Sequence, residues 1–270
     1  MDIVEIAALI GAAAWLPQIG QWVYRFVTKP KVVFVPVRNF EVGFSVYGPM
    51  LNMRAALGAE RKDATITFVK ATLRHERGRT ITLHWTSFTE TFSQMRDKSG
   101  ETTEIEREQV ATALRISTAV LTEKFIRFQD VEFQHEALKL LDDANGLKDR
   151  LTVSDPSPTG MIASREFDAL TGHYRHGFCW EAGNYELLVE LRLLGVARPA
   201  VAYMNFVLDP RMVDGLRKNL ELVEKSFRAE LASEPVEPRG EFFWANPMVD
   251  TSRVLQSAYL PTRAPTRRTE

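Results

Sequence analysis

The sequence predicts a mainly β, α+β fold built as an antiparallel β-sandwich. Short segments rich in β-branched residues alternate between apolar and polar positions, and turn signals separate them. In two segments apolar residues recur at spacings of three and four, which predicts two amphipathic helices. An uncharged apolar run predicts a further helix at the N-terminus. With 270 residues, of which 45% are hydrophobic, the chain is long enough to bury a core.

The N-terminal segment, residues 1–29, contains an uncharged run over residues 6–24. A run of about 20 apolar residues can cross a bilayer, and the bases that follow it predict a cytoplasmic main domain. Pro17 and two glutamines weaken a span, so an interfacial anchor, or a helix packed on the body or on a partner, stays open. The apolar residues of this helix are Ile6, Leu9, Ile10, Leu16, Ile19, Trp22 and Val23.

Residues 30–208 are predicted to form the β domain. Residues 31–37 are rich in valine, and residues 64–75 alternate cleanly between two faces. A tight turn at Arg77-Gly78-Arg79 separates the second segment from residues 80–85, which predicts a β-hairpin. Later strands are expected over residues 179–194 and 199–208.

Other parts of this domain depart from the strand pattern. The polar residues 88–107 are predicted to form a long loop or an irregular edge, and residues 173–178 to form a turn. Between residues 131 and 148, apolar side chains recur at spacings of three and four, which predicts a helical insertion. The prediction is therefore a sandwich interrupted once by a helix.

Residues 209–232 are predicted to form an amphipathic helix. Asp209 is a favourable N-cap and Pro210 suits the first helical position. The apolar stripe of this helix either docks on the sandwich or pairs with a partner helix. Residues 233–270 read as a proline-rich, partly disordered tail. The stripe consists of Val213, Leu216, Leu220, Val223 and Phe227.

Residues 180–187, WEAGNYEL, carry a small residue two positions before Tyr185. This stretch resembles the strand that follows the tyrosine corner in immunoglobulin-like and fibronectin-like domains. The resemblance covers only this short stretch and implies a fold type. The chain departs from antibody-type domains because its one cysteine, Cys179, cannot form the paired disulfide.

His173, His176 and Cys179 form a local cluster of zinc-ligand types. A fourth ligand is missing nearby and Arg175 lies between the histidines, so we expect neither a metal site nor a cofactor there. A hydrolase or metal-dependent enzyme that uses these three residues stays as an alternative. The sequence contains no nucleophile elbow, phosphate-binding loop or dinucleotide fingerprint.

The net charge of −1 gives no basic excess, so no nucleic-acid partner is expected. One free cysteine favours a reducing compartment. We therefore expect a membrane-tethered, cytoplasmic β-sandwich that acts as a non-catalytic binding or assembly module. Its partners would be membrane lipid through the N-terminal helix, and a protein or a second copy of the chain. A second alternative is a soluble subunit whose N-terminal helix is buried against a partner.

Overall fold

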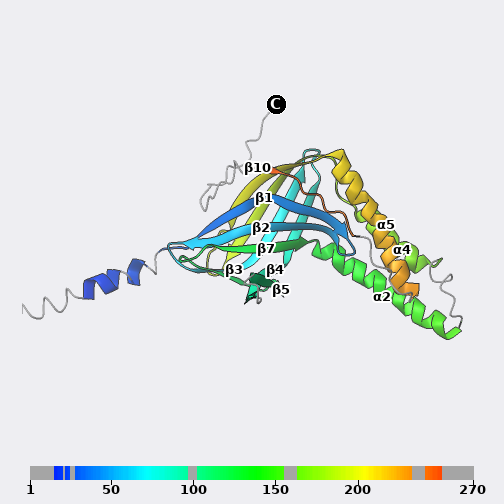
Figure 1. Cartoon of the computed structure of the whole chain (residues 1–270), viewed down its shortest axis with the longest axis horizontal. Coiled ribbons are helices and arrows are strands. Elements are labelled where there is room, and N and C mark those ends of the chain that lie inside the picture. Colours follow the sequence, from blue (N-terminus) through cyan, green and yellow to red (C-terminus); the bar gives the residue numbers. More distant parts are fainter. Residues whose placement is uncertain are drawn as a thin grey trace, which may run out of the picture.

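The fold is mainly antiparallel β, as the sequence predicts, and helices gather at one end of the sheet (Figure 1). Ten strands of the described chain form one sheet in the order β1-β2-β7-β4-β3-β8-β9-β10, with β5 beside β4 and β6 beside β3. The computed structural model describes residues 15–20, 22–24, 28–96, 102–154, 163–232 and 241–250.

Two long hairpins begin the sheet. Strand β1 (Lys31–Ser45) pairs with β2 (Gly48–Glu60), and β3 (Ala64–His75) pairs with β4 (Thr80–Arg96). Gly48 has a φ of 77°, which glycine adopts without strain at the tight turn between β1 and β2. The predicted hairpin after β3 is therefore present, with a longer second strand.

The described residues between 88 and 107 lie at an irregular edge of the sheet, one of the two expectations, and not in a long loop. Strand β4 continues to Arg96, and β5 (Thr102–Val110) pairs with it antiparallel, with a register shift between Thr91 and Ser93. The polar composition concealed this strand pairing. Alternating apolar residues indicate a strand with one buried face, whereas backbone hydrogen bonds between strands require no apolar face. Two further strands follow, β6 (Leu114–Ile116) and β7 (Thr122–Gln129).

The last strands bring the sheet back toward its first strand. Strand β8 (Gly183–Leu193) pairs with β9 (Ala200–Leu208), and β9 pairs with the short β10 (Val249–Asp250). Residues 242–250, here called the strap, also bridge β1 through two antiparallel contacts, Val42 with Ala245 and Asn39 with Met248. The strap therefore nearly closes the sheet into a barrel-like shape.

The immunoglobulin-like β-sandwich is not confirmed, because the described strands join in one sheet that curls back on itself. Strand β1 has 15 residues and a register shift between Pro36 and Phe40, and such irregularities bend a strand and increase its twist. A tyrosine corner is present locally. The Tyr185 hydroxyl accepts from the Glu181 N–H at 2.9 Å and donates to the Glu181 carbonyl at 3.1 Å. The local motif occurs here without the two-sheet fold.

Each of three helices at one end begins with a side-chain cap. The helices are α2 (Val131–Ser154), α4 (Arg165–Gly177) and α5 (Pro210–Ala232). Helix α2 extends past the predicted end at residue 148. The turn expected at residues 173–178 is wrong, because most of this segment is the last turn of α4. The caps are Asp130, Ser164 and Asp209, whose side chains accept from the N–H groups of Phe133, Phe167 and Met212.

An aromatic cluster joins the helices to the sheet. Phe44 of β1 lies edge-to-face with Phe133 of α2 and Tyr174 of α4, with ring centroids 6.1 and 6.3 Å apart. The Tyr174 hydroxyl donates to the Val46 carbonyl of the β1–β2 turn at 2.6 Å, and Phe227 of α5 packs against the Tyr174 ring. This end, here called the helix end, is covered by packed side chains.

The N-terminal residues 15–20 and 22–24 are helical and lie beyond the opposite end of the sheet (Figure 1). Leu16, Ile19, Trp22 and Val23 are exposed. The predicted helix residues Ile6, Leu9 and Ile10 lie outside the described residues. In the part of the chain that the structure describes, no helix is long and apolar enough to span a membrane.

Candidate functional site

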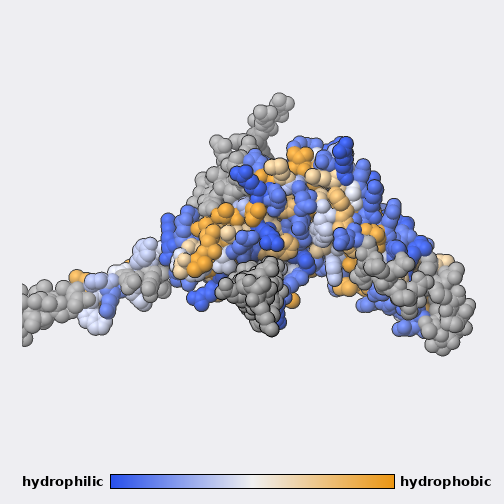
Figure 2. Space-filling view, viewed as in Figure 1, coloured by the Kyte–Doolittle hydropathy of each residue, from blue (hydrophilic) through white to orange (hydrophobic). Residues whose placement is uncertain are grey.

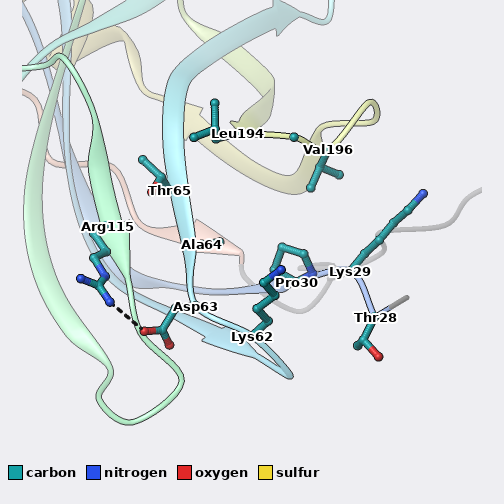
Figure 3. A pocket seen from close by; sticks show the side chains of 11 residues that line it. Thr28, Lys29, Pro30, Lys62, Asp63, Ala64, Thr65, Arg115, Leu194 and Val196 are labelled. Atoms are coloured by element: carbon teal, nitrogen blue, oxygen red, sulfur yellow. Dashed lines mark hydrogen bonds and ion pairs between the residues drawn. The ribbon is translucent and has the colours of Figure 1, made fainter. Parts of the chain in front are cut away.

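A cavity of about 500 Å³ lies at the end of the sheet opposite the helices, here called the linker end (Figure 3). The linker Thr28–Pro30, which leads from the N-terminal helical residues into β1, forms one wall. Residues Lys62–Thr65 at the start of β3, Arg115 of β6, and Leu194–Val196 after β8 form the others. Segments that are distant in sequence therefore meet around this cavity.

A hydrogen-bonded carboxylate organises the β3 side of the cavity. Asp63 accepts from the Thr118 backbone N–H at 2.8 Å and from the Thr118 hydroxyl at 3.0 Å. It also accepts from the Arg115 guanidinium at 3.3 Å, the contact drawn in Figure 3. The hydrogen bond from the Thr118 backbone is the main cause that lowers the pKa of Asp63. Asp63 therefore stays ionised and positions Arg115.

The cavity lining carries more positive than negative charge. Lys29, Lys62 and Arg115 contribute cations, whereas Asp63 is its acidic residue. The neighbouring acid Glu60 is paired with Lys31 at 2.9 Å. A cavity of this size lined by lysine and arginine suits a phosphate or another small anion, because their N–H groups donate to anionic oxygens.

The sequence patterns did not indicate this cavity. Residues 60–63 looked like an ordinary charged turn, and Arg115 like one position of a short strand. The cavity depends on the pairing of β6 with the start of β3 and of β8 with the other edge of β3. The usable local signal was the basic linker Lys29–Lys31 after the apolar run.

A second cavity, of about 560 Å³, lies at the helix end. Its charges are mixed, with Arg79 and His84 from β4 and its preceding turn facing Asp130 and Glu132 at the start of α2. Asp130 is already engaged as the cap of α2, where it accepts from the Phe133 N–H at 3.0 Å. The linker-end cavity has a clearer charge preference, so it is the stronger candidate.

His173 and His176, two residues of the candidate zinc-ligand cluster, each have structural contacts of their own. His173 stacks on Phe133 with ring centroids 4.2 Å apart, and its Nε2 lies 3.2 Å from the Phe133 carbonyl oxygen. His176 Nδ1 lies 2.7 Å from the Gly172 carbonyl oxygen within the same helix. Within the described ranges, no group of three or more His, Cys, Asp or Glu residues is placed to hold a metal ion.

Cys179 lines the second cavity but is almost fully buried. Burial raises the pKa of its thiol to about 12, which disfavours the thiolate that a nucleophile or a zinc ligand needs. The arrangement therefore gives no support to the alternative of a Cys179 hydrolase.

A buried histidine at the helix end was not singled out from the sequence. His75 Nε2 lies 3.2 Å from the Ala182 carbonyl oxygen, and its Nδ1 accepts from the Arg77 N–H at 3.3 Å. Its ring packs against Tyr185, and Glu181 lies 3.9 Å from Nδ1. Both ring nitrogens contact the backbone, which fits a residue that holds the β3–β4 turn against β8.

The stripe of α5 lies against the chain's own sheet, mainly along β1. Leu220 is half-buried, and the remaining four residues are buried. Of the two sequence-based alternatives, docking and pairing with a partner helix, docking is the one seen here. The buried residues are Val213, Leu216, Val223 and Phe227.

Comparison with known proteins finds no matching family model, no matching curated protein and no matching solved structure.

Proposed function

We propose that this chain is a membrane-tethered β-domain that acts as a non-catalytic binding or assembly module. The N-terminal helix is the tether and the barrel-like domain is the part that meets partners. The main domain would lie on the cytoplasmic side, because basic residues follow the apolar run. The helix would contact membrane lipid, and the domain would bind a protein partner or a second copy of the chain.

One observation carries the tether. The helical residues before the linker expose large apolar side chains, with Trp15 63% and Trp22 69% exposed. Exposed aromatic and aliphatic residues that cluster on one segment mark a lipid or protein contact more often than a solvated surface. Tryptophan and tyrosine favour the membrane interface, and Tyr24 lies directly before the linker.

Further support comes from the surface of the domain. Apolar patches on the face in Figure 2 lie over β1 and β2, between polar areas, toward the end where β1 begins. Val35 and Val37 on β1 are exposed. Apolar area of this kind on a sheet is suited to a protein partner. The expected partner class is therefore a protein that meets the outer face of the sheet.

The test is membrane association of the full chain. Expressed in cells, it is expected to sediment with membranes and to stay there after a carbonate wash. The double substitution Leu16→Asp with Ile19→Asp is expected to release it, because a carboxylate in the apolar layer costs about 2.5–3.5 kcal/mol per residue. Leu138→Asp, at an exposed position of α2, is the control that should leave sedimentation unchanged.

The outcomes separate the rival interpretations. A full chain that stays in the supernatant as a monomer would contradict the tether. The full chain could instead stay in the supernatant as part of a stable complex. If Leu16→Asp with Ile19→Asp dissociates that complex, the N-terminal helix is a protein-binding segment. Protease added to sealed inside-out vesicles should digest the main domain if it lies on the cytoplasmic side.

A further inference from the structure

We propose that the linker end is a second membrane contact, at which the basic cavity binds the phosphate of an anionic lipid headgroup while neighbouring loop tips enter the interface. This inference rests on the proposed tether and names the lipid class that the domain itself recognises. It concerns the cavity of Figure 3 and the two loops on either side of β3.

Two loops at the linker end carry exposed apolar tips. In the β8–β9 connection, Leu194 is 71% exposed, and in the β6–β7 connection Val120 and Leu121 are exposed. Both loops are fixed to the start of β3, since the Leu194 N–H donates to the Thr65 carbonyl at 2.9 Å. On the other side, Asp63 holds Thr118. The two connections are therefore both held beside the start of β3.

Single exposed apolar residues are common on soluble domains. These tips differ because bases accompany them at the same end. Lys29, Lys62 and Arg115 line the cavity, which Leu194–Val196 of the β8–β9 connection also borders. Peripheral membrane contacts combine two features. Apolar residues enter the boundary of the acyl chains, and lysine and arginine lie beside them at the phosphate layer.

The linker places this cavity at the depth of the headgroups. The Thr28 N–H donates to the Tyr24 carbonyl at 2.9 Å, so the cavity wall follows directly on the helical residues. Trp22 and Tyr24 suit the interface, and Lys29 follows Tyr24 by only five residues in the chain. A tethered chain therefore holds the basic cavity close to lipid phosphates.

The chemistry favours an anion with several oxygens. The Arg115 guanidinium has five N–H donors, and its contact with Asp63 uses one nitrogen. Lys29 of the linker and Lys62 of the β2–β3 turn add positive charge to the lining from two segments, although Lys29 points away from Arg115 in Figure 3. Thr28 and Thr65 add hydroxyl groups to the lining. A phosphate diester accepts from lysine and arginine N–H groups, whereas a zwitterionic headgroup brings its own cation into the basic surroundings.

The experiment uses the full chain in lipid nanodiscs and measures hydrogen–deuterium exchange. One set of discs is pure phosphatidylcholine and the other contains phosphatidylglycerol. The tether holds the chain in both. Slower exchange of residues 61–63, 117–121 and 194–198 in the anionic discs, with unchanged exchange in the helices, is the expected result. Equal exchange in both discs would overturn the headgroup site and leave the tether standing.

Matched variants assign the effect to the cavity. Lys29→Gln with Lys62→Gln should abolish the lipid-dependent protection. Lys139→Gln with Lys218→Gln removes the same charge from the helix end and should retain it. If both double variants lose the protection equally, a diffuse charge effect replaces the site. A full chain that fails to join any disc would instead contradict the tether, so the two failures can be distinguished.

A final arm separates the lipid headgroup from free phosphate. Inorganic phosphate is added to the chain in phosphatidylcholine discs. We expect no protection of the three loops, because the proposed site needs the bilayer beside the apolar tips. Protection by inorganic phosphate alone, removed by Lys29→Gln with Lys62→Gln, would overturn the lipid assignment and make the cavity a site for a soluble phosphate compound.

Discussion

The two ends of the sheet are built in opposite ways. At the helix end, three helices and the strap cover the strands, and aromatic rings and a buried asparagine hold the parts together. At the linker end, turns and loops surround a basic cavity, and several apolar tips are exposed. At the helix end most apolar side chains pack against one another and only scattered ones such as Leu138 are exposed, whereas at the linker end exposed apolar side chains lie beside the basic cavity.

The difference separates residues that hold the fold from residues that can recognise a ligand. Substitutions at the helix end should change the free energy of unfolding and leave membrane contact unchanged in the folded fraction. Substitutions at the linker end should weaken membrane contact and leave the free energy of unfolding unchanged. A set of matched variants, measured by denaturant unfolding of the full chain in mild detergent, tests this division.

The largest effect is expected for Leu216→Ser in α5. Leu216 is fully buried between the helix and the sheet. Losing its side chain removes apolar burial, leaves a cavity and adds a hydroxyl, and should lower the free energy of unfolding by about 4 kcal/mol. A loss below about 1 kcal/mol would show that α5 is not part of the cooperative unit.

Asn219→Ala should cost about 3 kcal/mol. The Asn219 amide donates to the Phe44 carbonyl at 3.0 Å and to the Phe243 carbonyl at 2.8 Å. Its oxygen accepts from the Phe243 N–H at 2.8 Å, so one side chain ties α5, β1 and the strap together. Truncation leaves buried polar groups without partners, which costs about 1–3 kcal/mol for each group.

The control for this variant is Asn246→Ala. Asn246 is exposed and its amide donates to the nearby Trp244 carbonyl in the strap, at 3.3 Å. Its unfolding free energy should stay within about 0.5 kcal/mol of the parent value. Equal losses for the two variants would mean that the strap, rather than the buried amide, sets the effect.

Gly43→Ala should cost about 2 kcal/mol. A Cβ at this position would overlap the Trp244 ring, which lies directly over the backbone of β1. The strap has to move to make room, and overpacking of this kind costs about 1–3 kcal/mol. Gly146→Ala is the matched control, because a Cβ there meets nothing within 4 Å and alanine favours the helix. An unchanged unfolding midpoint for Gly43→Ala would mean that the strap is not docked on β1.

The variants above change both features that the sequence predicts and features that it does not. The alternation in β3 and β8 predicts their strands, and Asp209 with Pro210 predicts the start of α5, because each signal is local. The strap is different, since Ala245 pairs with Val42 across most of the chain and shows no local pattern. Closure of the sheet was therefore beyond sequence reasoning, and a sandwich was expected instead.

In the candidate site, too, local features can be predicted from the sequence and long-range contacts cannot. Lys62 and Asp63 are visible in the sequence as a charged turn, but their meeting with Arg115 depends on strand pairing. Helix α4 was missed for another reason. Phe167, Leu170 and Tyr174 do recur at helical spacing, but the cluster at residues 173–178 is short and amphipathic, which favoured a turn.

A smaller and pH-dependent effect is expected for Glu224→Gln, about 1 kcal/mol at neutral pH. Partial burial alone raises the pKa of Glu224, but hydrogen bonds and charges from Arg175 and Arg228, at 2.6 and 2.7 Å, outweigh it and lower the pKa below 4.5. A lowered native pKa stabilises the fold above pH 4.5, and this contribution is lost as the pH falls through the native value.

Unfolding measured from pH 7 to pH 3 checks this prediction. The difference between the parent and Glu224→Gln should shrink as the pH falls below about 4.5. Glu221→Gln, at an exposed position one turn earlier in α5, should show no such trend. A constant difference at every pH would assign the effect to packing of the side chain instead of its charge.

The smallest effect on stability is expected for Leu194→Ser, the same substitution as in Leu216→Ser but at the linker end. Leu194 is 71% exposed, so serine there should change the free energy of unfolding by less than about 0.5 kcal/mol. In anionic nanodiscs the same variant should lose part of the lipid-dependent protection of residues 194–198, because the apolar tip no longer enters the interface. Leu138→Ser, an exposed position on α2, should change neither quantity. A loss of stability at Leu194 comparable to that at Leu216 would break the division between the two ends, since it would place the linker-end tips among the residues that hold the fold.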